Sequence, residues 1–252
     1  NDDEDNRGIR PLPNLDFKFV TANSLMGLPK VDQPQQSLYD DYQKIDELKE
    51  IRDQYFNASG IEREQLKTEF SEKQKELINE LISNHDFAGY EKAELTRKLT
   101  SWRPFKHTSS DWFDPEWMFG IKDGFDIVIA NPPYGAKLSN EEKISYNKLF
   151  KHQNYQLDTY LLFIEKGFEL LSEEKYLTYI IPNTWISNLK LMEIRRFLFK
   201  RNKVLEINHF ASKVFDAVVN TEAILTQKTK NYPDVLKIKL WIDSQKIQSS
   251  EI

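Results

Sequence analysis

The chain has 252 residues and a hydrophobic content of 39%, which is enough for one large domain or for a domain with an added segment. It contains no cysteine, so disulfides and thiol-ligated metals are excluded, and the absence of a stretch of roughly eighteen apolar residues argues against a membrane partner. Its formal net charge of −5 does not by itself favour strong nucleic-acid binding, so the main phosphate contacts of a DNA-binding protein would have to come from segments outside this chain.

The first predicted element is a strand at residues 15–20, which is followed by the polar residues Asn23 and Ser24. From Ser37 to about Leu99, apolar residues recur three and four positions apart, and this spacing predicts two amphipathic helices in an antiparallel hairpin. The sequence between Asn57 and Gly60 provides the break between them. Two interpretations stay open, a solvated insertion that stabilises a larger enzyme and a lever that contacts DNA or links to a nuclease domain.

The segment from Trp102 to Phe119 is rich in aromatic residues and also contains Arg103, Lys106 and His107. Aromatic and basic side chains together can form a surface on which nucleic-acid bases stack. Such a cluster can equally pack a loop-rich segment onto the hydrophobic core. Both interpretations are kept at this point.

The apolar run Phe125–Ala130 leads directly into Asn131-Pro132-Pro133-Tyr134. At ordinary residue frequencies a chain of this length contains such a string by accident roughly a few times in a thousand. The run predicts a buried strand, and in open α/β sheets ligands bind at the carboxyl ends of the strands. Two prolines stiffen the turn and remove N–H donors, so it presents carbonyl groups. The Asn131 amide oxygen and the Pro132 carbonyl can accept the two hydrogens of an exocyclic amine, while Tyr134 offers a ring for stacking.

After Tyr134 the pattern alternates between helices and strands, which predicts an α/β fold, the second half of a doubly wound sheet with a terminal hairpin. The last two strands are expected to form a late antiparallel pair. The expected helices are 158–171 and 189–201, and the expected strands are 175–181, 204–210, 221–226 and 235–241.

These motifs together resemble the amino-group DNA methyltransferases that use S-adenosylmethionine, most closely the N6-adenine branch of restriction–modification systems. Besides residues 131–134, residues 15–25 resemble the family's third motif, which contacts the adenine of the cofactor. Residues 175–186 resemble the strand after the catalytic strand, and residues 214–225 resemble a later motif whose aromatic ring packs against the flipped base. Residues 114–120 resemble the approach to the catalytic strand in large type IIG-like restriction–methylation fusion proteins.

The resemblance implies a Rossmann-like class I methyltransferase sheet that is incomplete in its N-terminal half and carries a helical-hairpin insertion. Residues 11–30 would hold a strand and the cofactor-adenine motif, 35–100 the helical insertion, and 101–252 the catalytic part. The family's glycine-rich cofactor loop and the acidic strand end after it have no counterpart here. We therefore expect this chain to be the later part of a larger enzyme, with the main binding loop for S-adenosylmethionine outside it.

The resemblance also assigns roles to single residues. Asn131, Pro132, Pro133 and Tyr134 are expected to be catalytic, and Tyr134 and Phe215 to hold the target base. Expected contacts to S-adenosylmethionine come from Asn23, Ser24, Asn131 and Pro133; many relatives have Asp at the position of Asn23. No metal site is expected, because the four histidines lack ligand spacing. The expected partners are double-stranded DNA with a flipped adenine and the rest of a larger polypeptide or complex, in the cytoplasm of a prokaryote.

Three alternatives to adenine methylation stay open. Cytosine-N4 methyltransferases use the same chemistry but more often carry Ser at the position of Asn131. Protein-glutamine methyltransferases also use Asn-Pro-Pro-Tyr but need no helical excursion at residues 37–99. A non-catalytic scaffold inside a restriction complex is the third. In each case the catalytic strand of an isolated fragment would have an open apolar edge, so we expect self-association or a displaced first segment.

Overall fold

The computed structural model describes residues 13–28, 43–84, 89–152, 156–210, 220–231, 235–242 and 247–251. The chain divides into two compact units, Asn1–Lys122 and Asp123–Ile252. Each unit has its own cluster of buried apolar side chains. No helix in the described ranges has both the length and the apolar character needed to cross a membrane.

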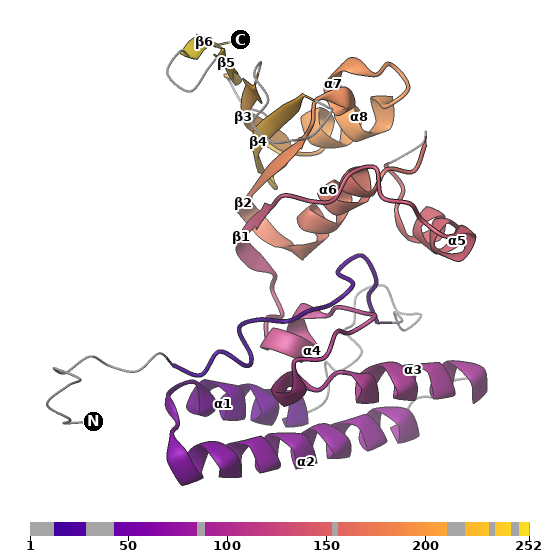
Figure 1. Cartoon of the computed structure of the whole chain (residues 1–252), viewed down its shortest axis with the longest axis vertical. Coiled ribbons are helices and arrows are strands. Elements are labelled where there is room, and N and C mark those ends of the chain that lie inside the picture. Colours follow the sequence, from indigo (N-terminus) through magenta and orange to yellow (C-terminus); the bar gives the residue numbers. More distant parts are fainter. Residues whose placement is uncertain are drawn as a thin grey trace, which may run out of the picture. The chain divides into compact units, whose positions relative to one another are not determined.

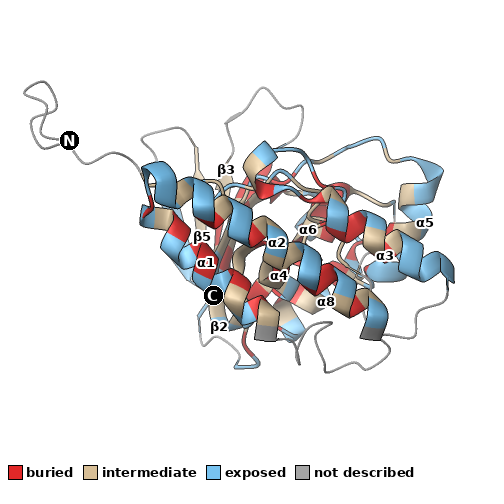
Figure 2. Cartoon of the chain, turned by 90° about the horizontal axis from the view of Figure 1, so that it is seen from below, coloured by how far each residue is buried: buried red, intermediate tan, exposed pale blue. Residues whose placement is uncertain are grey.

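The first unit is helical (Figure 1). The predicted hairpin is present, because α1 and α2 pack against each other on either side of a short break, and Gly60 at the start of α2 adopts a φ of 57°. The second predicted helix is divided into two, α2 and α3. Figure 2 shows buried residues along one side of these helices and exposed residues along the other. The elements are α1 (Gln43–Asn57), α2 (Gly60–Asn84), α3 (Gly89–Ser101), the 3-10 helix η1 (Pro104–Lys106) and α4 (Pro115–Phe119).

The aromatic segment after α3 belongs to the core of this unit. Trp102, Trp112 and Trp117 are buried among the leucines of the helices. The indole Nε1 of Trp112 donates to the Lys98 carbonyl at 2.9 Å, so its polar atom is satisfied inside the unit. Packing onto the core, rather than an exposed stacking surface, therefore describes these three rings.

The predicted strand at residues 15–20 is wrong. The segment forms a turn, in which the Lys18 N–H donates to the Leu15 carbonyl at 2.8 Å. The Phe17 ring is buried against Tyr55 and Phe70 of the helices. The alternation of apolar residues is typical of a strand. However, the described part of this unit contains no sheet with which the segment could pair, and the Phe17 ring packs into the helical core instead. Just after this segment, an isolated β-bridge joins Ala22 to Ser110.

The second unit contains a six-stranded sheet in the order β1-β2-β4-β3-β5-β6. Strand β1 runs parallel to β2, and β4 runs antiparallel to both of its neighbours. The predicted α/β class is confirmed. The elements are β1 (Phe125–Ala130), α5 (Asn140–Leu149), α6 (Thr159–Leu170), β2 (Leu171–Pro182), α7 (Thr184–Ser187), α8 (Met192–Lys200), β3 (Lys203–Phe210), β4 (Thr221–Gln227), β5 (Lys237–Trp241) and β6 (Ile247–Glu251).

The predicted late antiparallel pair is wrong. Strands β4 and β5 are not neighbours, because β3 lies between them and β5 runs parallel to β3. The antiparallel partner of β5 is β6. Strand β4 is largely buried, with Ile224 and Thr226 inaccessible, which suits a position inside the sheet. Alternating apolar residues identify a strand but not its neighbour, and a short connection does not guarantee a hairpin.

Helices α6 and α8 pack against the sheet, α6 against β1 and β2 and α8 against β3. On β1, Val128 and Ala130 pack against the core that these helices cover. Ile127 and Ile129 point to the other face and are 58% and 74% exposed. Strand β1 ends the sheet and, among the described strands, pairs only with β2. The predicted open apolar edge at this strand is therefore present. The prediction that this strand is buried is wrong, because none of its residues is buried and one of its faces is exposed at the end of the sheet.

Candidate active-site loop after strand β1

The loop after β1 places its side chains alternately outward and inward. Asn131 and Pro133 are exposed, Pro132 is buried, and Tyr134 is partly buried against the apolar core of the second unit. Gly135 has a φ of 67°, a conformation that side-chain-bearing residues rarely adopt. The space around its missing Cβ is open, so the backbone angle alone favours glycine here.

Two hydrogen bonds from the start of α6 hold this loop. The hydroxyl of Thr159 donates to the Pro133 carbonyl at 2.6 Å. The N–H of Gly135 donates to the Asp158 carboxylate at 3.0 Å. The two bonds lie immediately before and after Tyr134, so the backbone on both sides of that ring is fixed by one helix terminus.

The Asn131 side chain is available for a ligand. In the ranges that the structure describes, no hydrogen bond engages its amide group. Its exposed position at the carboxyl end of β1 is the place where α/β sheets bind ligands. The following Pro132 has no N–H, so the main chain at this point offers a carbonyl and no donor.

Behind the loop, a second group of polar contacts links the ends of the strands. The Tyr160 hydroxyl lies 3.0 Å from the Thr184 hydroxyl at the start of α7, and burial raises the pKa of Tyr160 to about 12. The buried Trp185 donates from Nε1 to Glu222 at 2.9 Å, and Nδ1 of His209 lies 2.9 Å from the other oxygen of the same carboxylate. Burial raises the pKa of Glu222, against the opposing effect of these two hydrogen bonds. The Glu222 oxygens thus bind Trp185 and His209, which is the pattern of a structural carboxylate.

The predicted cofactor residues Asn23 and Ser24 belong to the first unit. The Asn23 side-chain oxygen accepts the Leu25 N–H at 3.2 Å, and the Asn23 N–H donates to the Ser110 carbonyl at 2.9 Å. This is the geometry of an asparagine that stabilises its own turn. Ser24 is partly buried.

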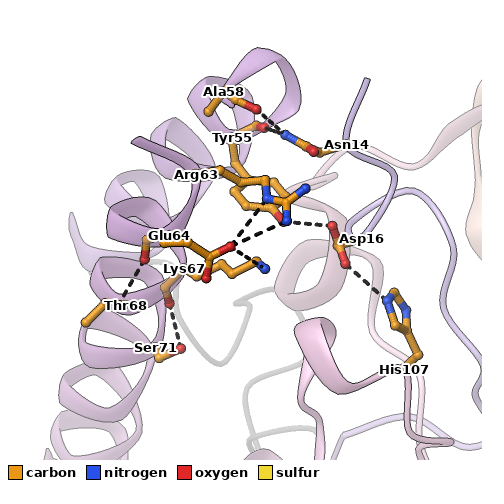
Figure 3. A network of polar contacts seen from close by, with 10 residues as sticks. All are labelled: Asn14, Asp16, Tyr55, Ala58, Arg63, Glu64, Lys67, Thr68, Ser71 and His107. Atoms are coloured by element: carbon orange, nitrogen blue, oxygen red, sulfur yellow. Dashed lines mark hydrogen bonds and ion pairs between the residues drawn. The ribbon is translucent and has the colours of Figure 1, made fainter. Parts of the chain in front are cut away.

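A polar network ties the same segment to the helices (Figure 3). The Asp16 carboxylate accepts the Tyr55 hydroxyl at 2.7 Å and lies 3.1 Å from Nε2 of His107. Burial, together with the Asp16 carboxylate, raises the pKa of Tyr55. The amide of Asn14 donates to the carbonyls of Tyr55 and Ala58, both at 2.7 Å. The segment before Asn23 is therefore anchored on α1 of the first unit.

The structure brings together four of the predicted site residues, Asn131 to Tyr134, in a single loop. Phe215 lies outside the described residues. Sequence reasoning missed Asp158 and Thr159, which hold this loop. The available signal was Asp-Thr at the start of a predicted helix, but those residue types there usually indicate only an N-cap.

A groove of about 700 Å³ lies in the first unit between α2, the end of α3 and η1. Its lining includes the apolar residues Ile78, Leu99 and Phe105 and the exposed basic residues Lys75 and Arg103. None of the predicted site residues in the described ranges lines it. Among the described residues, no group of three or more histidine and carboxylate side chains is arranged to hold a metal ion.

Comparison with known proteins gives a match over most of the chain. The family model described as Eco57I restriction-modification methylase matches residues 18–215, more than three quarters of the chain. A type II restriction enzyme and methyltransferase of Escherichia coli, RM.Eco57I, is 30% identical over 129 residues, which cover 47% of this chain and 13% of that protein. The type II methyltransferase M.BstVI of Geobacillus stearothermophilus is 35% identical over 112 residues, covering 43% of this chain and 20% of that protein.

The chain therefore spans a fifth or less of the length of these two curated relatives. Among solved structures, the type IIG restriction endonuclease BpuSI aligns with a TM-score of 0.41 and 15% identity, over 61% of this chain and 19% of that one. The predicted resemblance to methyltransferases of restriction–modification systems is confirmed by the family match.

Proposed function

Because the chain belongs to the Eco57I restriction-modification methylase family, we propose that it carries the methyl-transfer part of a DNA methyltransferase in a restriction–modification system. We propose further that the acceptor is N6 of adenine and that the methyl donor is S-adenosylmethionine. The observation that carries this proposal is the Asn131–Tyr134 loop at the carboxyl end of β1, with an exposed amide followed by a donor-free turn.

The chemistry assigned to this loop is the activation of a weak nucleophile. The lone pair of an adenine amino group is delocalised into the ring, so the nitrogen reacts poorly on its own. The Asn131 side-chain oxygen accepts one amino hydrogen and the Pro132 carbonyl accepts the other, which draws the lone pair out of the ring and towards the methyl group. Tyr134 stacks on the base, which has to be flipped out of the duplex to reach the loop.

The residues present fit part of a site for S-adenosylmethionine, which when bound supplies a methyl group activated by a sulfonium. Asn131 and Pro133 are exposed beside the proposed point of transfer and can contact this group. Ser24 offers a hydroxyl, whereas the Asn23 oxygen is already engaged by the Leu25 N–H. These residues are the contribution that we assign to this chain.

The proposal is tested in the intact enzyme with labelled S-adenosylmethionine and duplex DNA, and the product nucleoside is identified by mass spectrometry. We expect N6-methyladenine. N4-methylcytosine, or methylation of protein glutamine instead of DNA, would replace the adenine assignment. Binding of the cofactor without transfer to any of these acceptors would indicate a scaffold.

The role of Asn131 is tested with Asn131→Ala. The expected result is a loss of about 100- to 1,000-fold in turnover, as for other preorganised polar contacts to a reacting group, with cofactor binding mostly retained in calorimetry. The matched control is Asn140→Ala, which changes another exposed asparagine of the second unit, at the first position of α5. Normal turnover of Asn131→Ala would exclude the proposed role.

A further inference from the structure

We propose that Asp158 and Thr159 are a positioning pair that sets the Tyr134 ring and the adjoining carbonyls for the base. This inference rests on the proposed function, because it gives Tyr134 a base to contact. Its geometrical content is the pair of hydrogen bonds on either side of Tyr134, from Thr159 to the Pro133 carbonyl and from Gly135 to Asp158.

The first supporting observation is that Asp158 does not perform the usual task of its position. It is the N-cap residue of α6, where an Asp normally accepts an N–H from the first turn of its own helix. Here it makes no side-chain capping bond and accepts the Gly135 N–H instead. The carboxylate therefore stabilises the loop in place of its own helix.

The second observation is the burial of Thr159, which is 4% exposed. Its hydroxyl contact to the carbonyl of the exposed Pro133 is partly buried. Removing the hydroxyl takes this donor away from the Pro133 carbonyl, and the remaining contacts then hold the loop less firmly. Pro132 and Pro133 already restrict the backbone of this loop, so the two hydrogen bonds fix the orientation of a stiff turn.

The third observation is that the helix terminus is itself fixed to the sheet. The next residue, Tyr160, is buried and its hydroxyl contacts Thr184 directly after β2. The loop after β1 and the segment after β2 are thus both held by the first residues of α6. A displacement of α6 would move Tyr134 relative to Asn131, although Asp158 and Thr159 themselves touch no substrate.

The test uses two pairs of variants in the intact enzyme. Thr159→Val and Asp158→Ala remove the contacts, whereas Thr159→Ser and Asp158→Asn keep an oxygen that can make them. We expect kcat to fall about 10- to 100-fold in the first two, since small displacements of reacting groups cost rates of this order. KM for S-adenosylmethionine should change little, and the conservative variants should restore kcat.

Thr226→Val is the matched control, because Thr226 is a fully buried threonine whose hydroxyl also donates to a backbone carbonyl, that of Leu177. It should leave kcat unchanged. An equal loss of kcat in this control would mean that general destabilisation explains the effect, and would overturn the inference.

Hydrogen exchange tests the positioning pair independently of the proposed function. The Gly135 amide should exchange faster in Asp158→Ala but not in Asp158→Asn, and this readout needs no methylation. An enzyme that methylates no DNA but shows this exchange pattern would overturn the proposed function and support the contacts of the positioning pair. Wild-type kcat in both Thr159→Val and Asp158→Ala would overturn the inference, whether or not the exchange rate changes.

Discussion

The two units differ in how they bury their apolar side chains. In the first, amphipathic helices and the aromatic segment enclose a core from several sides, and residues such as Leu48, Leu77 and Leu81 are fully buried. In the second, helices cover the sheet on one face, and on the other face Ile127 and Ile129 of the terminal strand remain exposed. The proposed catalytic loop follows this terminal strand.

This difference indicates a division of roles. A helical unit with an enclosed core can be stable without further partners. A strand with one free edge presents backbone N–H and C=O groups that can pair with another chain, and its exposed apolar face favours such association. The proposed chemistry therefore lies in the unit that has a strand with a free edge.

The largest expected effect comes from cutting into each core in turn. Leu81→Ala in the first unit and Leu177→Ala in the second should each cost about 2–5 kcal/mol of unfolding free energy, since both leucines are fully buried. If the cores are energetically separate, each substitution should lower hydrogen-exchange protection only in its own unit. Equal loss of protection in both units after either change would show one cooperative core and remove the distinction.

A smaller effect is expected from a glycine at the interface of helix and sheet. A Cβ at Gly167 of α6 would collide with the side chains of Leu177 and Tyr179 on β2. Gly167→Ala should therefore cost about 1–3 kcal/mol through overpacking, measured by urea unfolding. Gly89→Ala is the control in the first unit, because its Cβ would meet nothing within 4 Å, and replacing a helical glycine there should be neutral or stabilising. A neutral Gly167→Ala would mean that α6 does not approach the sheet this closely.

The same contrast separates what the sequence could predict from what it could not. The strand at residues 125–130, the loop after it and the helical hairpin follow from local patterns that the structure reproduces. The apolar residues around Phe17 gave the same strand signal, but the ring is buried against helices. The choice between these outcomes depends on which partners the rest of the chain supplies, and this information is not local.

The site shows the same limit. Asn131 could be proposed as a site residue because an amide before two prolines is unusual, whereas Asp158 looked like an ordinary N-cap. The role proposed for Asp158 depends on a hydrogen bond to Gly135, 23 residues away, which no short-range pattern contains. The position of β4 between β2 and β3 was missed for a related reason, since strand neighbours are chosen by burial across the whole sheet.

A pH-dependent effect is expected from the buried carboxylate of the second unit. Burial raises the pKa of Glu222 above its ordinary value of 4.5, so the folded state holds this proton at a pH where the unfolded state has lost it. The stability that this proton contributes is fully present below pH 4.5 and is lost as the pH rises through the folded pKa. Glu222→Gln should remove this part of the pH dependence of the unfolding free energy. It is measured as the difference between wild-type and variant unfolding free energies at several pH values from 4.5 upwards, and a difference that does not vary with pH would contradict the raised pKa.

The smallest effect on stability, and the one that tests the comparison most directly, concerns the exposed face of β1. Ile129→Lys should change the unfolding free energy by no more than about 0.5 kcal/mol, because the side chain is already 74% exposed. It should nevertheless reduce self-association of the 252-residue chain, since a charge on an edge strand opposes pairing with a second copy. Ile61→Lys is the matched control, because Ile61 in the first unit is 80% exposed but lies on a helix without a free strand edge. Sedimentation velocity over a range of concentrations should show association in wild type and Ile61→Lys and a shift to monomer in Ile129→Lys. A wild-type chain that stays monomeric at all concentrations would show that the exposed edge strand does not cause self-association. The proposed difference between the two units would then be wrong.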